Sequence, residues 1–94
     1  SNHKKYFNEQ MDIAEFAKKW FLGSKFEKIL IVKDLKPERN NILKFLEILL
    51  KMVDQTFAQN PKKGATTAKK MLITYDRISK NGNIKLALLN LILS

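Results

Sequence analysis

Apolar side chains in this chain recur every three or four residues over nearly its whole length, from Asn8 to Ser94. This interval matches the turn of an α-helix and differs from the two-residue alternation of a half-buried strand. Ile31 and Val32 would also suit a strand, but no second β-rich run is present to pair with them. The sequence therefore predicts an all-α fold, a single small bundle of four to five helices.

The length of 94 residues allows one small domain. Residues 1–7 are expected to be a tag remnant or a disordered tail, because Ser1 and Asn2 resemble the scar left by a protease used in expression. His3, the only histidine, falls in this tail and is given no role. Residues 8–94 are predicted to be the helical domain, with Asn8 as the first N-cap.

Two short helices are predicted first. The first is expected to bury one face and to end at Gly23, and Ser24 is expected to cap the second. The apolar face of the first helix comprises Ile13, Phe16, Ala17, Trp20 and Phe21. On the second, Phe26, Ile29, Leu30 and Lys33 line up on one side.

A long central helix is predicted over about residues 37–59, starting at Pro37 with Glu38 in its first turn. Its apolar arc is wide, which is typical of a helix packed against several others. The main stripe comprises Ile42, Phe45, Leu46, Leu49, Val53 and Phe57, and Leu43, Leu50 and Met52 widen it.

The segment "NPKKGATT", residues 60–67, combines Asn-Pro, Gly and two Thr and is interpreted as a loop. A fourth helix is expected after it, ending at Asn81 and Gly82 in a left-handed turn. Its predicted buried face comprises Ala68, Met71, Leu72, Tyr75 and Ile78.

The closing segment is the most apolar of the chain and is predicted to be a helix over about residues 83–93, capped by Asn83. Its spacing defines an inner face of Ile84, Ala87, Leu88, Leu91 and Ile92. A second set, Leu86, Leu89 and Leu93, falls on another side. Because a terminal helix needs only one buried face, this second set is either covered within the domain or is a candidate protein interface.

Few side chains in the sequence carry catalytic chemistry. Cysteine is absent and histidine occurs once, which excludes disulfides, thiol nucleophiles and conventional zinc clusters. The carboxylates are spread singly along polar faces, and "GATTAKK" lacks the second glycine and the Lys-Ser/Thr order of a phosphate-binding loop. We therefore predict no catalytic, cofactor-binding or metal-binding residue, and no enzymatic activity.

The formal net charge is +9, and all basic residues except Arg39 and Arg77 are lysines. A basic patch is predicted at Lys62, Lys63, Lys69 and Lys70, on either side of the expected loop. Such charge makes a small basic nucleic-acid-binding domain the alternative function. The aromatic residues lie on the apolar stripes, however, so that the pattern of single-strand binding is missing.

The sequence contains no signal peptide and no apolar stretch of about 20 residues that could span a bilayer. A cytoplasmic protein without membrane contact is therefore expected.

Three blocks resemble, in order, the carboxy-terminal domain of the delta-prime subunit of bacterial DNA polymerase III, a part of the sliding-clamp loader. They are "FAKKWFLGSKFEKILIVKDL", "ERNNILKFLEILLKMVDQTF" and "RISKNGNIKLALLNLILS", within residues 12–94. Asp54 occupies a commonly acidic position of that family. The ending Asn-x-Asn-x-x-Leu-Ala-Leu is matched by Asn81, Asn83, Leu86, Ala87 and Leu88.

The resemblance implies a domain excised from a longer subunit, whose amino-terminal part is an AAA+ module. In that family the domain joins the collar domains of the gamma/tau and delta subunits in a ring. The implied role is non-catalytic oligomerisation for clamp loading during DNA replication, with DNA contacted only indirectly or weakly.

Two departures from the family pattern are present. Ile84 stands where a proline commonly follows the second asparagine, and the stretch between Phe57 and Met71 is shorter than in many relatives. The second departure leaves the sister delta subunit open as an alternative assignment.

Overall fold

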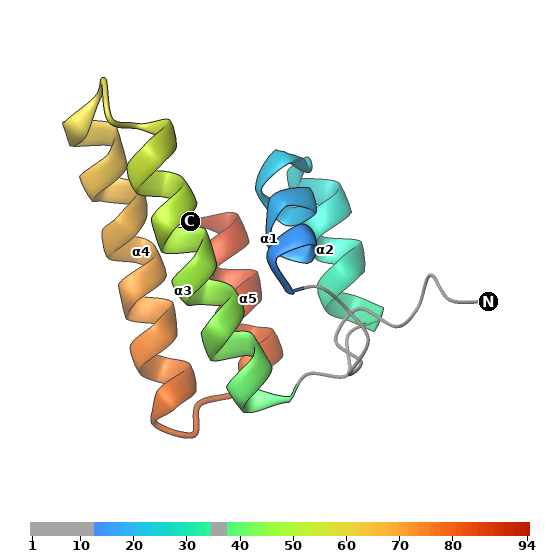
Figure 1. Ribbon diagram of the computed structural model, residues 1–94. Coiled ribbons are helices and arrows are strands. Elements are labelled where there is room, and N and C mark those ends of the chain that lie inside the picture. The colour runs from blue at the N-terminus through green and yellow to red at the C-terminus, as the bar shows by residue number, and fades with distance from the viewer. Residues whose placement is uncertain (1–12, 35–37) are drawn as a thin grey trace.

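The computed structural model describes residues 13–34 and 38–94, which form five α-helices and no strand (Figure 1). The helices are α1 (Ile13–Leu22), α2 (Lys25–Asp34), α3 (Arg39–Thr56), α4 (Pro61–Ser79) and α5 (Ile84–Leu93). The all-α prediction is thereby confirmed. The predictions for the tail with His3, for the cap at Asn8 and for Pro37 lie outside the described residues.

Successive helices run in alternating directions (Figure 1). The long helix α3 contacts α1 and α4, and α5 contacts α4 and α2. Every described helix therefore has at least one packed neighbour, and short connections between consecutive elements are enough to produce this up-and-down arrangement.

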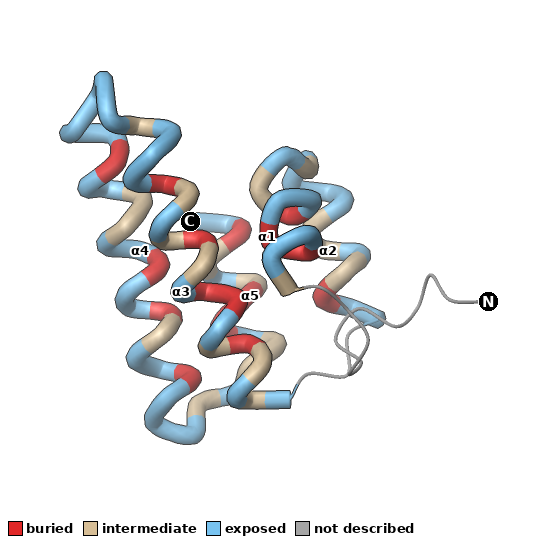
Figure 2. Tube along the Cα trace, in the orientation of Figure 1, coloured by how far each residue is buried: buried red, intermediate tan, exposed pale blue. Residues whose placement is uncertain are grey.

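The core is centred on α3 (Figure 2). Phe45 of α3 packs against Phe16 and Trp20 of α1, with ring centroids 5.2 and 5.4 Å away. The Trp20 and Phe45 rings meet edge to face, an arrangement that adds to the stabilisation from burial alone. Five residues of the predicted stripe of α3 are fully buried: Ile42, Phe45, Leu46, Leu49 and Val53. The sixth, Phe57, is half-buried and is the C-cap, because α3 ends at Thr56 and not near the predicted residue 59.

The connection between α1 and α2 is a capping box. The Ser24 hydroxyl accepts from the Glu27 N–H, and the Glu27 carboxylate accepts from the Ser24 N–H, both at 3.2 Å. Two backbone donors at the start of α2 are thereby satisfied by side chains. The predicted stop at Gly23 and cap at Ser24 are confirmed.

The predicted loop over residues 60–67 is wrong, because α4 already begins at Pro61. Asn60 is its N-cap and accepts from the Lys63 N–H at 3.4 Å, while proline suits the first turn because its missing N–H would have no partner there. Gly64 is buried against Phe57, and a Cβ at Gly64 would lie 3.0 Å from the Phe57 Cβ. The glycine therefore permits a close approach of α4 to the end of α3 instead of marking a loop.

The buried face of α4 also differs from the prediction at Leu72 and Thr74. Leu72 is 55% exposed, whereas Thr74 is buried, its hydroxyl donating to the Lys70 carbonyl at 3.0 Å. Helix α4 packs against both α3 and α5, and its buried residues Met71, Thr74 and Ile78 follow the three-and-four spacing of one helix face. A threonine is tolerated there because its helix satisfies the hydroxyl.

Tyr75 links α4 to α3 through its phenol, which donates to the Glu47 carboxylate at 3.3 Å. Burial and the negative charge of Glu47 raise the pKa of Tyr75 above its ordinary value. The raised pKa widens the alkaline range over which the phenol keeps its proton and can donate this hydrogen bond.

The turn between α4 and α5 is held by backbone bonds of the Schellman type. The Gly82 N–H donates to the Arg77 carbonyl at 2.8 Å, and Asn81 adopts the left-handed conformation with φ 67°. Asn81 is therefore the left-handed residue of the predicted turn.

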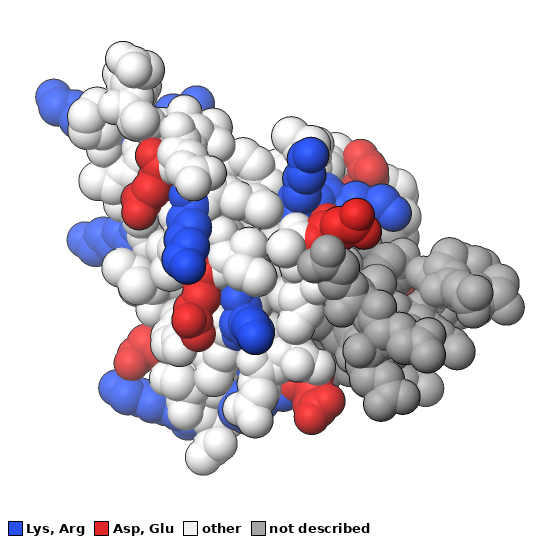
Figure 3. All heavy atoms as spheres, viewed as in Figure 1, with Lys and Arg blue, Asp and Glu red and all other residues white. Residues whose placement is uncertain are grey.

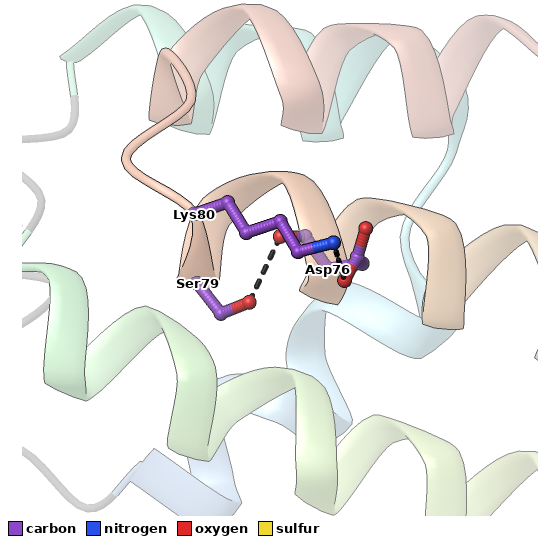
Figure 4. Close-up of polar contacts among 3 residues, drawn as sticks. All are labelled: Asp76, Ser79 and Lys80. Atoms are coloured by element: carbon purple, nitrogen blue, oxygen red, sulfur yellow. Dashed lines mark hydrogen bonds and ion pairs between the residues drawn. The ribbon is translucent and has the colours of Figure 1, made fainter.

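At the end of α4, Lys80 pairs with Asp76 at 3.2 Å and the Ser79 hydroxyl donates to the Asp76 carbonyl (Figure 4).

A long-range contact fixes this turn to the start of α3. The Arg39 guanidinium donates to the carbonyls of Ile78 and Gly82, the latter at 3.3 Å. The Ile78 carbonyl belongs to the last turn of α4, where the helix dipole favours a cation. Arg39 thus ties the first turn of α3 to the segment that leads into α5.

Replacing Arg39 by alanine should lower the free energy of unfolding by about 2 kcal/mol, because two bonds to a charged donor are lost at a partly buried site. Chemical denaturation measures this change. Arg77→Ala removes the other arginine, which is exposed, and should cost less than about 0.5 kcal/mol. Equal losses for the two variants would contradict the assigned role of Arg39.

Candidate protein interface

Helix α5 has two unlike faces. Its inner face is buried at Ala87, Leu88 and Ile92 and half-buried at Ile84 and Leu91. Asn83 caps the helix by accepting from the Leu86 N–H at 2.9 Å. The predicted inner face and N-cap of the terminal helix are both confirmed.

The predicted second face of α5 is open to solvent at two of its three positions. Leu86 is 57% exposed and Leu93 is 64% exposed, whereas Leu89 is half-buried against the core. Residues 86, 89 and 93 follow the three-and-four spacing of a seam that receives another helix. We call Leu86, Leu89 and Leu93 the α5 outer face.

Neighbouring helix α2 contributes two exposed apolar side chains that were not singled out as an interface. Phe26 is 69% exposed and Leu30 is 45% exposed, and they lie four residues apart on one face of α2. Lys85 in the first turn of α5 donates to the Lys33 carbonyl in the last turn of α2, at 3.2 Å. The two helices run antiparallel (Figure 1), and Phe26 lies in the first turn of α2.

The sequence places Phe26 and Leu30 on one side of α2, together with Ile29 and Lys33. It does not show which helix packs against α2. Because α5 covers only part of α2, Val32 becomes the buried residue of α2, and Phe26 and Leu30 remain in solvent.

Two adjoining hollows lie between α4 and α5, with volumes of about 310 and 190 Å³. Both are lined by Arg77 of α4 and Asn90 of α5. Leu86 lines the larger hollow, and Ile73 and Leu91 line the smaller one. Leu86 of the α5 outer face therefore borders a recess that polar and charged side chains of α4 and α5 also line.

A cleft of about 410 Å³ between α1 and α2 is lined by Trp20, Glu27, Lys28 and Asp34, among others. Burial, together with the charge of Lys25, lowers the pKa of Lys28 below its ordinary value.

Among the described residues, no group of three histidine, cysteine or acidic side chains is placed to hold a metal ion.

The predicted basic patch lies on α4 and not around a loop. Lys62 and Lys63 occupy the first turn, and Lys69 and Lys70 follow two turns later on the same helix. All four are exposed, and Lys63 lies over the Phe57 ring, with its Nζ 5.4 Å from the centroid. Figure 3 shows basic side chains along the edge of the molecule formed by α4.

Comparison with known proteins identifies no relative. No protein-family model, curated protein or solved structure matches the chain. In the described part of the chain, no helix is both long and apolar enough to cross a membrane.

The exposure of Leu86 predicts that folding does not need its side chain. Leu86→Ser should change the free energy of unfolding by less than about 0.5 kcal/mol, as is usual for surface positions. Leu88→Ala, two residues away on the buried face, should cost about 3 kcal/mol. Urea denaturation compares the two, and a large loss for Leu86→Ser would show that Leu86 is part of the core.

Proposed function

We propose that this chain is a non-catalytic oligomerisation domain of the DNA polymerase III clamp loader, which holds subunits in a ring collar during DNA replication. The observation that carries the proposal is the α5 outer face. Leu86 and Leu93 are more than half exposed on a helix whose other face is already buried.

Burying these leucines in a neighbour would provide the energy of association. Full burial of a leucine contributes about 1.5–3 kcal/mol, so the remaining exposed area of Leu86 and Leu93 is worth about 1–2 kcal/mol each. Phe26 and Leu30 on α2 are further exposed apolar side chains that could be covered in an assembly. No bond is made or broken, because the work of the domain is association alone.

The resemblance supplies the class of neighbour. The collar domains of the gamma/tau and delta subunits are the proposed partners, and ATP-driven changes in the AAA+ modules act through the assembled ring. The charge of +9 supports unlike partners over self-association, since two copies of this chain repel each other.

Mixing the chain with purified gamma/tau and delta collar domains should give a defined heteromeric assembly by size-exclusion chromatography with light scattering. The double substitution Leu86→Asp and Leu93→Asp should weaken this association by more than about a hundredfold, because two apolar contacts are replaced by charges that must be desolvated.

Leu72→Asp is the matched control. Leu72 is as exposed as Leu86 but lies on α4, away from the two α4–α5 hollows. Association should persist in this variant. The proposal is wrong if the unmodified chain forms no assembly, or if Leu72→Asp disrupts the assembly as strongly as the α5 substitutions.

A further inference from the structure

Helix α4 carries its positive charge on one side. Successive residues of an α-helix are rotated by about 100° around its axis. On this geometry five basic residues fall within an arc of roughly 100°: Lys62, Lys69, Lys70, Arg77 and, just past the helix end, Lys80. All five side chains are exposed. We call these five residues the α4 basic face.

The exposed charges of helix α3 can be compared with those of α4 in the same molecule. Its exposed charges alternate in sign along the chain as Lys44, Glu47, Lys51 and Asp54, and the alternation is visible at the centre of Figure 3. On α4 the only acidic residue is Asp76, which pairs with Lys80 at 3.2 Å. The single sign of charge is thus a property of α4 and not of every helix.

Four of the five cations take no part in the internal structure. Within the described residues, the side chains of Lys62, Lys69, Lys70 and Arg77 make no hydrogen bond or ion pair. Lys62 also lies in the first turn of α4, where the helix dipole disfavours a cation. Folding alone therefore gives no reason for four free cations in one row.

We propose that the α4 basic face binds the phosphate backbone of a nucleic-acid duplex without reading its sequence. The 19 residues of α4 extend over about 28 Å, the length of about eight base-pair steps. Lysines provide point charges for phosphate, whereas base recognition favours the bidentate contacts of arginine, of which the face has one.

Other polyanion-binding or apolar partners fit this face less well. No aromatic ring lies on it, since Tyr75 is turned toward Glu47 of α3, so bases of a single strand have nothing to stack on. Ile73 is the one large apolar side chain within the arc, too little for the apolar centre of a protein interface or for insertion into a membrane.

This inference is independent of the proposed oligomerisation. It rests on charges of α4, whereas association rests on leucines of α5, and each can be removed without the other. A chain that binds duplex and forms no collar assembly would support only this inference, and the reverse result would support only the collar.

The experiment is a fluorescence-anisotropy titration of 20-base-pair duplexes of two unrelated sequences at 50, 100 and 200 mM salt. We expect equal affinities for the two sequences, with a dissociation constant of about 1–100 µM that rises steeply with salt. In the Lys69→Glu/Lys70→Glu variant the affinity should fall at least about tenfold, and the salt slope should become shallower by about two.

Lys18→Glu/Lys19→Glu is the matched control, because it makes the same change of net charge at an exposed lysine pair on α1. Its affinity should stay within about threefold of the unmodified chain. The Lys69→Gln/Lys70→Gln variant only neutralises the pair, and its affinity for duplex should fall by less. Circular dichroism checks that each variant is folded.

Four results would overturn the proposal. They are the absence of binding at 50 mM salt, an equal loss in the α1 control, tighter binding of a single strand than of the duplex, and competition by polyglutamate as effective per charge as by duplex. The last result would assign the α4 basic face to an acidic protein.

Discussion

The burial of α3 on two sides is the constraint on which the rest of the bundle depends. Its stripe from Ile42 to Val53 is fully buried, with α1 packed on one side and α4 on the other. Phe45 joins the aromatic rings of α1 to this stripe. Because α1 and α4 occupy these two sides, α5 packs mainly between α4 and α2, and Leu86 and Leu93 of its outer face stay exposed.

Two surfaces of different chemistry result from this arrangement. The α5 outer face is apolar, whereas the α4 basic face is almost purely cationic. They meet at the larger hollow between α4 and α5, which Arg77 lines from one helix and Leu86 from the other. The two proposed roles, association and phosphate binding, therefore fall on adjacent helices.

Local signals predicted the helices well where one physical cause dominated. Ser24, Asn81 and Asn83 act through their own hydrogen bonds or backbone conformation, so that short stretches of sequence were enough to place those helix ends. The loop prediction for residues 60–67 was wrong because Asn, Pro, Gly and Thr are common both in loops and in a capped first turn. The close approach of Phe57 to Gly64, which decides between the two, joins separate helices.

The sequence by itself determined the helical class, the buried stripe of α3 and the two-faced character of α5, because these follow from residue spacing along a single helix. Only the tertiary structure decided which faces stay open. It buried Thr74 instead of Leu72, exposed Phe26 and Leu30, and brought Arg39 to the carbonyls of Ile78 and Gly82. These outcomes depend on which helices are neighbours, and the periodicity of one helix contains no information about the position of the next.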